Sequence, residues 1–235
     1  LGSYNNIAVR GLALSGATAY VMTAIDGVLV IDVSDPSAPA LLGSYDNGEN
    51  GESVAIGSGG VVFTSYRGFN RGSIDAIDFS DPASPVVLDT YDSPFVGIFP
   101  LELSVQGDRL YYATEAPGLT TLDVSNPAAI AELDTLVEVV CTRVTTRAGL
   151  AVVASEGYGV SLIELTPTPR VIGLAQFPGD SEGLRVRDGL AFVADGSSLN
   201  IVDVSDPASP RPLSVYAPAG QGHNSVDVQG SFAYT

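Results

Sequence analysis

Arginine, glutamate, aspartate and a single histidine are the side chains of this sequence that could bind a charged ligand or transfer a proton. His223 is the only histidine, which excludes a multi-histidine iron or copper centre, and the lone Cys141 disfavours zinc and iron–sulfur sites. Calcium, a hard cation with oxygen ligands, is an open alternative. The candidate metal ligands are Asp26, Glu115, Glu156 and Asp195. The candidates for acid–base chemistry or for contact with a partner are Arg10, Glu52, Arg67, Arg71, Glu102, Arg143, Glu182, Arg185 and His223.

Many of these candidates lie in irregular connections between short apolar runs. The irregular connections cover residues 46–52, 92–102, 136–143, 176–183 and 217–224. The stretch "YRGFNRG" at 66–72 is an insertion that places Arg67 and Arg71 as a basic finger on an acidic rim. Irregular loops can vary without disturbing a core, so we expect function there. The aromatic residues expected to contact a partner are Tyr66, Phe69, Phe95, Phe99 and Tyr158.

The apolar runs between the connections are copies of one repeat. The stretch "VIDVSDPSAP" at 30–39 returns as "AIDFSDPASP", "TLDVSNPAAI", "LIELTPTP" and "IVDVSDPASP". An acidic residue ends each run every 39 to 46 residues, at Asp32, Asp78, Asp123, Glu164 and Asp203. This period is typical of a four-stranded propeller blade. In the first period the strands are predicted at 11–15, 18–23, 27–33 and 40–45, and in the fifth at 183–187, 190–195, 199–204 and 211–216.

The Ser-Asp-Pro step after each run is interpreted as a corner between the third and fourth strands. Asp35 can accept backbone N–H bonds, and the ring of Pro36 fixes φ for a tight turn. On this interpretation Asp32 and its equivalents are structural, and a ring of cation ligands is the alternative. Four tyrosines recur at the ends of fourth strands and are expected to pack between blades: Tyr4, Tyr45, Tyr91 and Tyr216.

The repeat resembles the LVIVD-repeat family, and "GVLVIDVSDPSAPALLGSY" at 27–45 matches its pattern best. The resemblance covers practically the whole chain, although "IELTPTP" in the fourth repeat lacks the Asp before Pro. It implies a β-propeller in a secreted or surface-attached bacterial protein. We expect an all-β fold with five complete four-stranded antiparallel blades and a split sixth, either six-bladed or a fragment of a larger propeller. Since "LGSYNN" at 1–6 matches "LGSYDN" at 42–47, we expect residues 1–235 to form a single domain of a longer chain.

Charge limits the partners that this chain can bind. Its 27 acidic and ten basic residues, all arginine, give a net charge of −17, which argues against binding nucleic acid or an anionic membrane. No apolar run reaches 18 residues, so no membrane span is expected. Cys141 follows two valines and is expected in the core.

These observations favour a binding or assembly module that engages a protein or glycan partner through its loop face. We expect it in the extracellular space, on the cell surface or in the periplasm of a bacterium, and without a cofactor. The alternative is a propeller enzyme, or a calcium-dependent binding domain, that uses the Arg, Glu and His residues.

Overall fold

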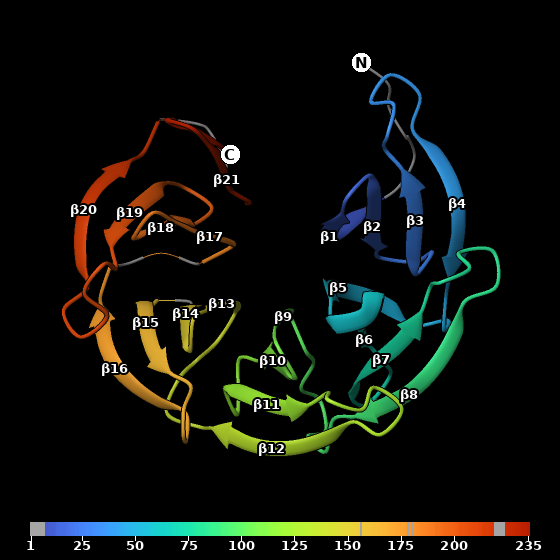
Figure 1. The fold of residues 1–235 in the computed structure, drawn as a ribbon. Coiled ribbons are helices and arrows are strands. Elements are labelled where there is room, and N and C mark those ends of the chain that lie inside the picture. Colours follow the sequence, from blue (N-terminus) through green and yellow to red (C-terminus); the bar gives the residue numbers. More distant parts are fainter. Residues whose placement is uncertain (1–7, 156, 178, 180, 219–223) are drawn as a thin grey trace. The chain divides into compact units, whose positions relative to one another are not determined.

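The computed structural model describes residues 8–155, 157–177, 179, 181–218 and 224–235 (Figure 1). Within these ranges the regular elements are β-strands and one short 3₁₀-helix, Ser58–Gly60. The chain forms two compact units. The first contains Leu1–Tyr112 and Thr121–Leu133, and the second contains Ala113–Thr120 and Asp134–Thr235. No helix in the described ranges is long and apolar enough to cross a membrane.

Five sheets of four strands carry the fold, and in each sheet the strands follow one another in chain order (Figure 1). The first sheet contains β1 (Val9–Ser15), β2 (Thr18–Thr23), β3 (Val28–Asp32) and β4 (Ala40–Tyr45). The second contains β5 (Asn50–Ile56), β6 (Val61–Arg67), β7 (Gly72–Asp78) and β8 (Val86–Asp92). The third contains β9 (Glu102–Gln106), β10 (Arg109–Ala113), β11 (Leu119–Asp123) and β12 (Ala131–Leu136).

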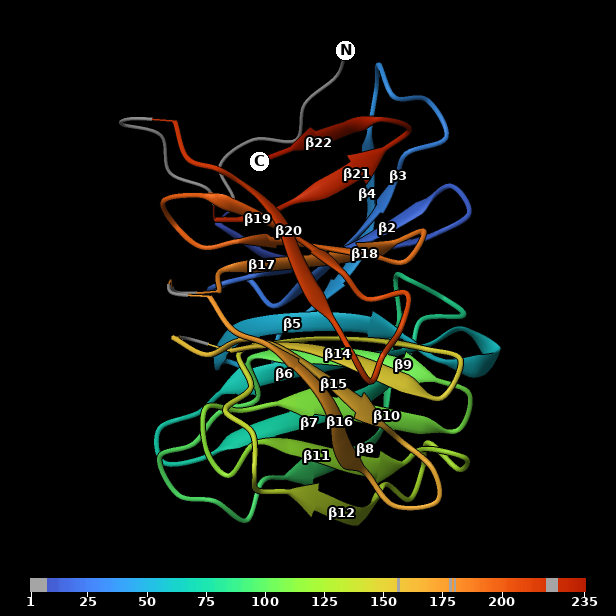
Figure 2. The same ribbon diagram turned by 90° about the vertical axis from the view of Figure 1, so that its left-hand side faces the viewer.

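The remaining sheets belong to the second unit. The fourth contains β13 (Arg143–Arg147), β14 (Leu150–Ser155), β15 (Gly159–Glu164) and β16 (Arg170–Ala175). The fifth contains β17 (Gly183–Arg187), β18 (Leu190–Ala194), β19 (Leu199–Asp203) and β20 (Arg211–Tyr216). A last hairpin of β21 (Asp227–Gln229) and β22 (Phe232–Tyr234) contacts β17 (Figure 2).

The β-propeller fold predicted from the repeat is confirmed. The five sheets are complete blades of antiparallel strands, and the last hairpin is a partial sixth. Each third strand ends on the predicted acidic residue. Second and third strands are mostly buried because both of their faces are packed. The clearest case is β7, which is buried along all but its last residue.

Apolar side chains from consecutive sheets form the cores of the two units. In the first unit, Met22 and Val28 of the first sheet pack with Val62, Ile77 and Phe79 of the second. A further cluster joins Phe63 and Ile74 to residues of the third sheet. In the second unit, Val152 and Leu162 of the fourth sheet share one core with Ala191, Val202 and Val204 of the fifth sheet and its corner. Cohesion within each unit therefore rests on burial between sheets as well as on strand pairing.

The Ser-Asp-Pro corners are structural, as predicted. The Asp32 carboxylate accepts the Ser34 backbone N–H at 2.8 Å, and the Asp35 carboxylate accepts the Ser37 backbone N–H at 2.9 Å. The second, third and fifth sheets repeat both bonds, with Asn126 in place of the second Asp at the third corner. The bond from the Ser34 backbone N–H lowers the pKa of the Asp32 carboxyl. The carboxylates therefore fix turns, in the way that Asx turns do elsewhere.

In the first and fourth sheets, a glycine in the fourth strand allows the corner of the next sheet to approach closely. A Cβ added at Gly43 would lie 1.7 Å from the Pro82 carbonyl oxygen, and one at Gly173 would lie 2.1 Å from the Pro207 oxygen. The second sheet has Asp89 at this position. Its carboxylate contacts the next corner by accepting the backbone N–H of Ile130 at 2.7 Å. The fourth-strand position is thus a contact between neighbouring blades.

The expected burial of Cys141 is confirmed, and so is the expected packing of Tyr45 and Tyr91. The hydroxyl of Tyr45 donates to Asp75 in the next sheet, and the hydroxyl of Tyr91 donates to Glu132 in the next sheet. Tyr216, at the end of β20, is 62% exposed, so the packing expectation is wrong there, and Tyr4 lies outside the described residues. Cys141 is fully buried, and its backbone N–H donates to the Thr114 carbonyl oxygen at 3.2 Å. The thiol is therefore a core group of the second unit.

Candidate functional site

Three irregular loops meet at one end of the first unit. They are the β4–β5 loop (46–49), the β6–β7 loop (68–71) and the β8–β9 loop (93–101). The Gly97 backbone N–H donates to the Asn70 carbonyl oxygen at 2.7 Å, which joins the last two loops. The Ser73 hydroxyl donates to Glu49 at 3.1 Å, which joins the first loop to β7. Because each loop is tied to another or to a strand, together they present one defined surface.

Two of the candidate residues at this end of the first unit, Arg67 and Glu52, form an ion pair. The Arg67 Nε atom donates to Glu52 Oε1 at 2.8 Å, and the guanidinium lies 4.9 Å from the centre of the Phe99 ring. The ion pair leaves little of either charge for a substrate, and the cation–π contact fixes the β8–β9 loop against β6. In this geometry Arg67 and Glu52 position the loops.

The β6–β7 and β8–β9 loops carry an exposed group that we name the Phe69 patch, formed by Phe69, Asn70, Arg71 and Val96. The Phe69 side chain is 98% exposed and that of Val96 is 69% exposed. Arg71 is exposed, and no described carboxylate forms an ion pair with it. Apolar side chains beside an unneutralised arginine, on loops held by hydrogen bonds, have the composition of a protein-contact surface.

The aromatic contacts predicted from the sequence are partly wrong. Tyr66 is fully buried in the core of the first unit, because β6 continues through Arg67 and carries this ring inward. Phe95 and Phe99 are half-buried, and Phe99 lies against Arg67. Tyr158 is exposed, but it belongs to the second unit. Of the five predicted aromatic contacts, Phe69 alone is both exposed and part of the first-unit loop surface.

The remaining candidates of the first unit do not join the Arg67–Glu52 pair through any ion pair in the described ranges. Arg10 and Asp26 are exposed, at β1 and in the β2–β3 loop. The Asp26 backbone N–H donates to the Thr23 hydroxyl at 2.8 Å, which closes that loop. Glu102 is half-buried at the start of β9. The structure thus gathers Glu52, Arg67 and Arg71 around one loop pair and leaves the others spread over the unit.

In the second unit the predicted arginines are engaged in structural contacts. Arg143 Nε donates to the Glu182 carbonyl oxygen at 2.6 Å, so it binds the backbone of this candidate and not its carboxylate. Arg185 pairs with Asp227 at 2.9 Å and ties β17 to the last hairpin. Glu115 is exposed on the β10–β11 loop. Glu156 and His223 lie outside the described residues.

Asp195, a candidate calcium ligand, closes the β18–β19 loop. Its carboxylate accepts the Ser198 backbone N–H at 2.5 Å, the Ser198 hydroxyl at 2.6 Å and the Asn200 amide at 2.7 Å. Burial alone would raise its pKa, but these bonds and those from Ser197 outweigh burial and lower it. Across the described ranges, no three His, Cys, Asp or Glu side chains gather as a metal site requires. In the described geometry the Asp195 carboxylate therefore serves to close its own loop.

The sequence analysis missed Asp75, an almost completely buried carboxylate in the middle of β7. It is 2% exposed and accepts hydrogen bonds from the Thr90 hydroxyl at 2.7 Å, the Tyr45 hydroxyl at 3.2 Å and the Asn47 amide at 3.2 Å. Burial raises the pKa of Asp75 although these bonds oppose the shift, and burial beside Asp75 raises the pKa of Tyr45 to about 12. Because Asn47 belongs to the β4–β5 loop, this network positions one of the three loops. An acidic residue inside the buried run "SIDAI" was the signal available in the sequence.

The LVIVD repeat model matches residues 8–47, 66–93, 101–136 and 178–217, which together make up more than half of the chain. The chain belongs to the LVIVD-repeat family. The segment from 137 to 177, which holds the fourth sheet, is not matched. This is the repeat whose sequence departs from the pattern. Within the family, then, the fourth blade of this chain is the least typical.

One solved structure confirms the fold independently of the repeat sequence. The crystal structure of the computationally designed Ika8 protein, a designed propeller, is similar over 97% of this chain and 68% of its own, with a TM-score of 0.67. The two sequences are 10% identical, so the likeness shows the fold alone. A search of curated proteins gave no significant match.

Proposed function

We propose that this LVIVD-repeat propeller is a binding module that engages a protein partner through the Phe69 patch. The observation that carries the proposal is the Phe69 side chain, which is 98% exposed on a loop held by its neighbours. Burying a large aromatic ring away from water is favourable, and in the free chain the Phe69 ring is not buried. A partner that covers the ring would therefore gain this transfer free energy on binding.

Charge indicates the chemistry of the partner. Arg71 carries one of only ten positive charges in a chain of net charge −17, and no described carboxylate pairs with it. An arginine beside an apolar anchor matches a segment that presents an apolar side chain next to an Asp or Glu. The Asp75 network and the Arg67–Phe99 contact hold the flanking loops, which lowers the entropy lost on binding.

The test compares immobilised wild-type chain with Phe69→Ala, Arg71→Ala and the control Phe232→Ala. Phe232 is also an exposed phenylalanine, but it lies on β22 in the second unit. Proteins retained from the native source are identified, and affinities are measured with the purified partner by biolayer interferometry. We expect Phe69→Ala to weaken binding at least about tenfold and Phe232→Ala to leave it unchanged. Equal retention by all variants, or a retained ligand that proves to be a glycan, would overturn the proposal.

We also propose that the chain acts outside the bacterial cytoplasm, at the cell surface, in the medium or in the periplasm. Support comes from the resemblance of its repeats to secreted and surface-attached bacterial proteins. Fractionation of the source cells, followed by detection with an antibody against this chain, tests the location. Detection in the cytoplasmic fraction alone would overturn this part.

A further inference from the structure

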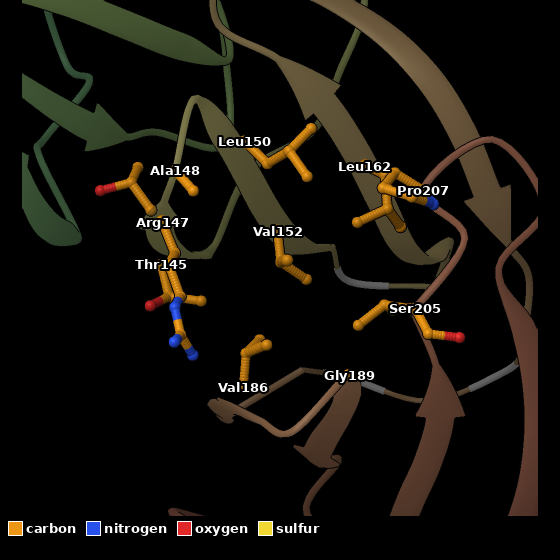
Figure 3. Close-up of a pocket in the computed structure, with 12 residues that line it drawn as sticks. Thr145, Arg147, Ala148, Leu150, Val152, Leu162, Val186, Gly189, Ser205 and Pro207 are labelled. Carbon is orange, nitrogen blue, oxygen red and sulfur yellow. The ribbon is translucent and has the colours of Figure 1, made fainter.

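A pocket of about 340 Å³ lies between the fourth and fifth sheets of the second unit. It opens at the end of these sheets where the β13–β14 and β17–β18 turns and the β19–β20 corner lie, opposite to their β14–β15 and β18–β19 loops. Figure 3 shows Leu150, Val152 and Leu162 on the side of the fourth sheet, with Val186, Gly189 and Ser205 across from them. This site involves none of the residues of the proposed partner surface.

The pocket exists because the fourth sheet carries a small residue at a position where other sheets carry a ring. Val152 pairs with Leu162 in the strand register. At the same position Tyr20 pairs with Val30, Phe63 with Ala76, and Phe192 with Ile201. Each of these aromatic rings is larger than valine, so Val152 leaves space against the next sheet.

On the opposite wall of the pocket, a valine again stands where another sheet has an aromatic ring. Between the first and second sheets, Tyr20 packs against Phe79 with ring centres 5.8 Å apart. Phe79 directly follows the acidic residue that ends its third strand, and Val204 holds that position in the fifth sheet. Two valines therefore stand in the fourth–fifth interface where two rings fill the first–second interface.

A single charged side chain, Arg147, lines the otherwise mostly apolar pocket. In the fifth sheet the equivalent Arg187 is neutralised, since its Nε atom pairs with Asp188 of the same turn at 3.2 Å. The fourth-sheet turn has Ala148 in place of that Asp, with the same left-handed backbone, φ 51° against 50°. No described carboxylate forms an ion pair with Arg147, whereas Arg170, Arg185 and Arg211 of the same unit are all paired.

We propose that this pocket binds a small carboxylic acid with an apolar body, either one aromatic ring or a short alkyl chain. The carboxylate pairs with the guanidinium of Arg147, a charge-assisted contact that arginine makes in two-pronged geometry. The apolar body occupies the space beside Val152 and Val204. A volume near the lower end of the ~300–1,000 Å³ range of small-molecule sites limits the ligand to this size.

The test is fluorine NMR of para-fluorophenylacetate added to the purified chain, with para-fluorophenylacetamide as the uncharged probe. We expect saturable binding of the acid, and weaker binding of the amide by about tenfold or more. Val152→Phe, which restores the ring of the other sheets, should abolish binding of both probes. Ala148→Asp, which recreates the turn of the fifth sheet, should weaken only the acid. Thermal unfolding of each variant establishes that it is folded.

Three results would overturn the proposal. The first is no saturable binding of the acid at millimolar concentration. The second is unchanged binding in Ala148→Asp and Arg147→Gln, two surface variants that decide the matter even where Val152→Phe does not fold. The third is tighter binding of para-fluorobenzylamine than of the acid, which would show that the acidic surface and not Arg147 selects the ligand.

Discussion

The interface between the first and second sheets and the interface between the fourth and fifth are built from the same repeat. Aromatic rings fill the first, which we call the filled interface, whereas the second, which we call the hollow interface, keeps a pocket beside its apolar core. The rings of Tyr20 and Phe79 contact each other in the first interface with their planes tilted by 58°, and Val152 and Val204 border a pocket of about 340 Å³ in the second. Both interfaces share the close approach of a fourth-strand glycine to the next corner, at Gly43 and Gly173. The repeat therefore specifies how blades dock at their corners, and it leaves open how the space between them is filled.

Removing a ring from the filled interface should give the largest effect. Phe79 is 4% exposed, so Phe79→Ala loses the transfer free energy of the ring and creates a cavity beside Tyr20. We expect the free energy of unfolding to fall by about 3–5 kcal/mol, measured by urea denaturation. Val204→Ala, at the same position in the hollow interface, should cost about half as much or less. Equal losses at the two positions would contradict the difference in filling.

Both interfaces have a fourth-strand glycine against the next corner. Replacing this glycine with alanine should lower the free energy of unfolding by less than Phe79→Ala does, and by the same amount in both interfaces. Gly43→Ala and Gly173→Ala each place a Cβ within 2.1 Å of a proline carbonyl oxygen of the next corner. Overpacking of this kind costs about 1–3 kcal/mol in urea denaturation. Ser214 occupies the same register position in the fifth sheet and is exposed, so Ser214→Ala is the matched control with no expected change. If Gly173→Ala were tolerated, the corner contact would matter in the filled interface alone.

The smallest effect should come from Asp75, the buried carboxyl group of the filled interface. Burial raises the pKa of Asp75, so the folded chain keeps its proton at pH values where the unfolded chain has lost it. The stability of wild type relative to Asp75→Asn should therefore be greatest below about pH 4 and decline as the pH rises through the raised pKa. Urea denaturation at a series of pH values measures this difference.

Asp203 supplies the control with the opposite sign. Hydrogen bonds from Ser205 and the bond to Arg211 lower its pKa to about 2, so the advantage of wild type over Asp203→Asn should be lost as the pH falls from about 4 towards 2. A raised pKa of Asp75 in the folded chain would be contradicted by either of two results. The stability difference between wild type and Asp75→Asn could be independent of pH, or it could change with pH in the same direction as the difference for Asp203→Asn.

The sequence predicted the blades well because each one repeats the same local physics. Strands at 18–23, 40–45, 183–187 and 211–216 match the structure to the residue, since each lies between turn residues that stop a strand. The corner at Asp32 was also predictable, because the Asp side chain bonds to an amide two residues away and needs no distant partner.

The candidate site was less predictable because it depends on contacts that no repeat encodes. Tyr66 was assigned to a loop, and the length of β6 alone decides that it is buried. The bond from Gly97 to Asn70 joins two loops of unrelated sequence. The pocket beside Val152 follows from comparing one register position across sheets, and this comparison requires the strand pairing.

The buried Cys141 can report local opening of the second unit. It is the only thiol, it is fully buried, and its backbone amide is bonded to the Thr114 carbonyl of the β10–β11 loop. A thiol reagent can reach it only during the moments when the second unit loosens around it. The rate of alkylation in native buffer therefore measures how often the second unit opens locally around Cys141. Mass spectrometry can follow this rate without any engineered label.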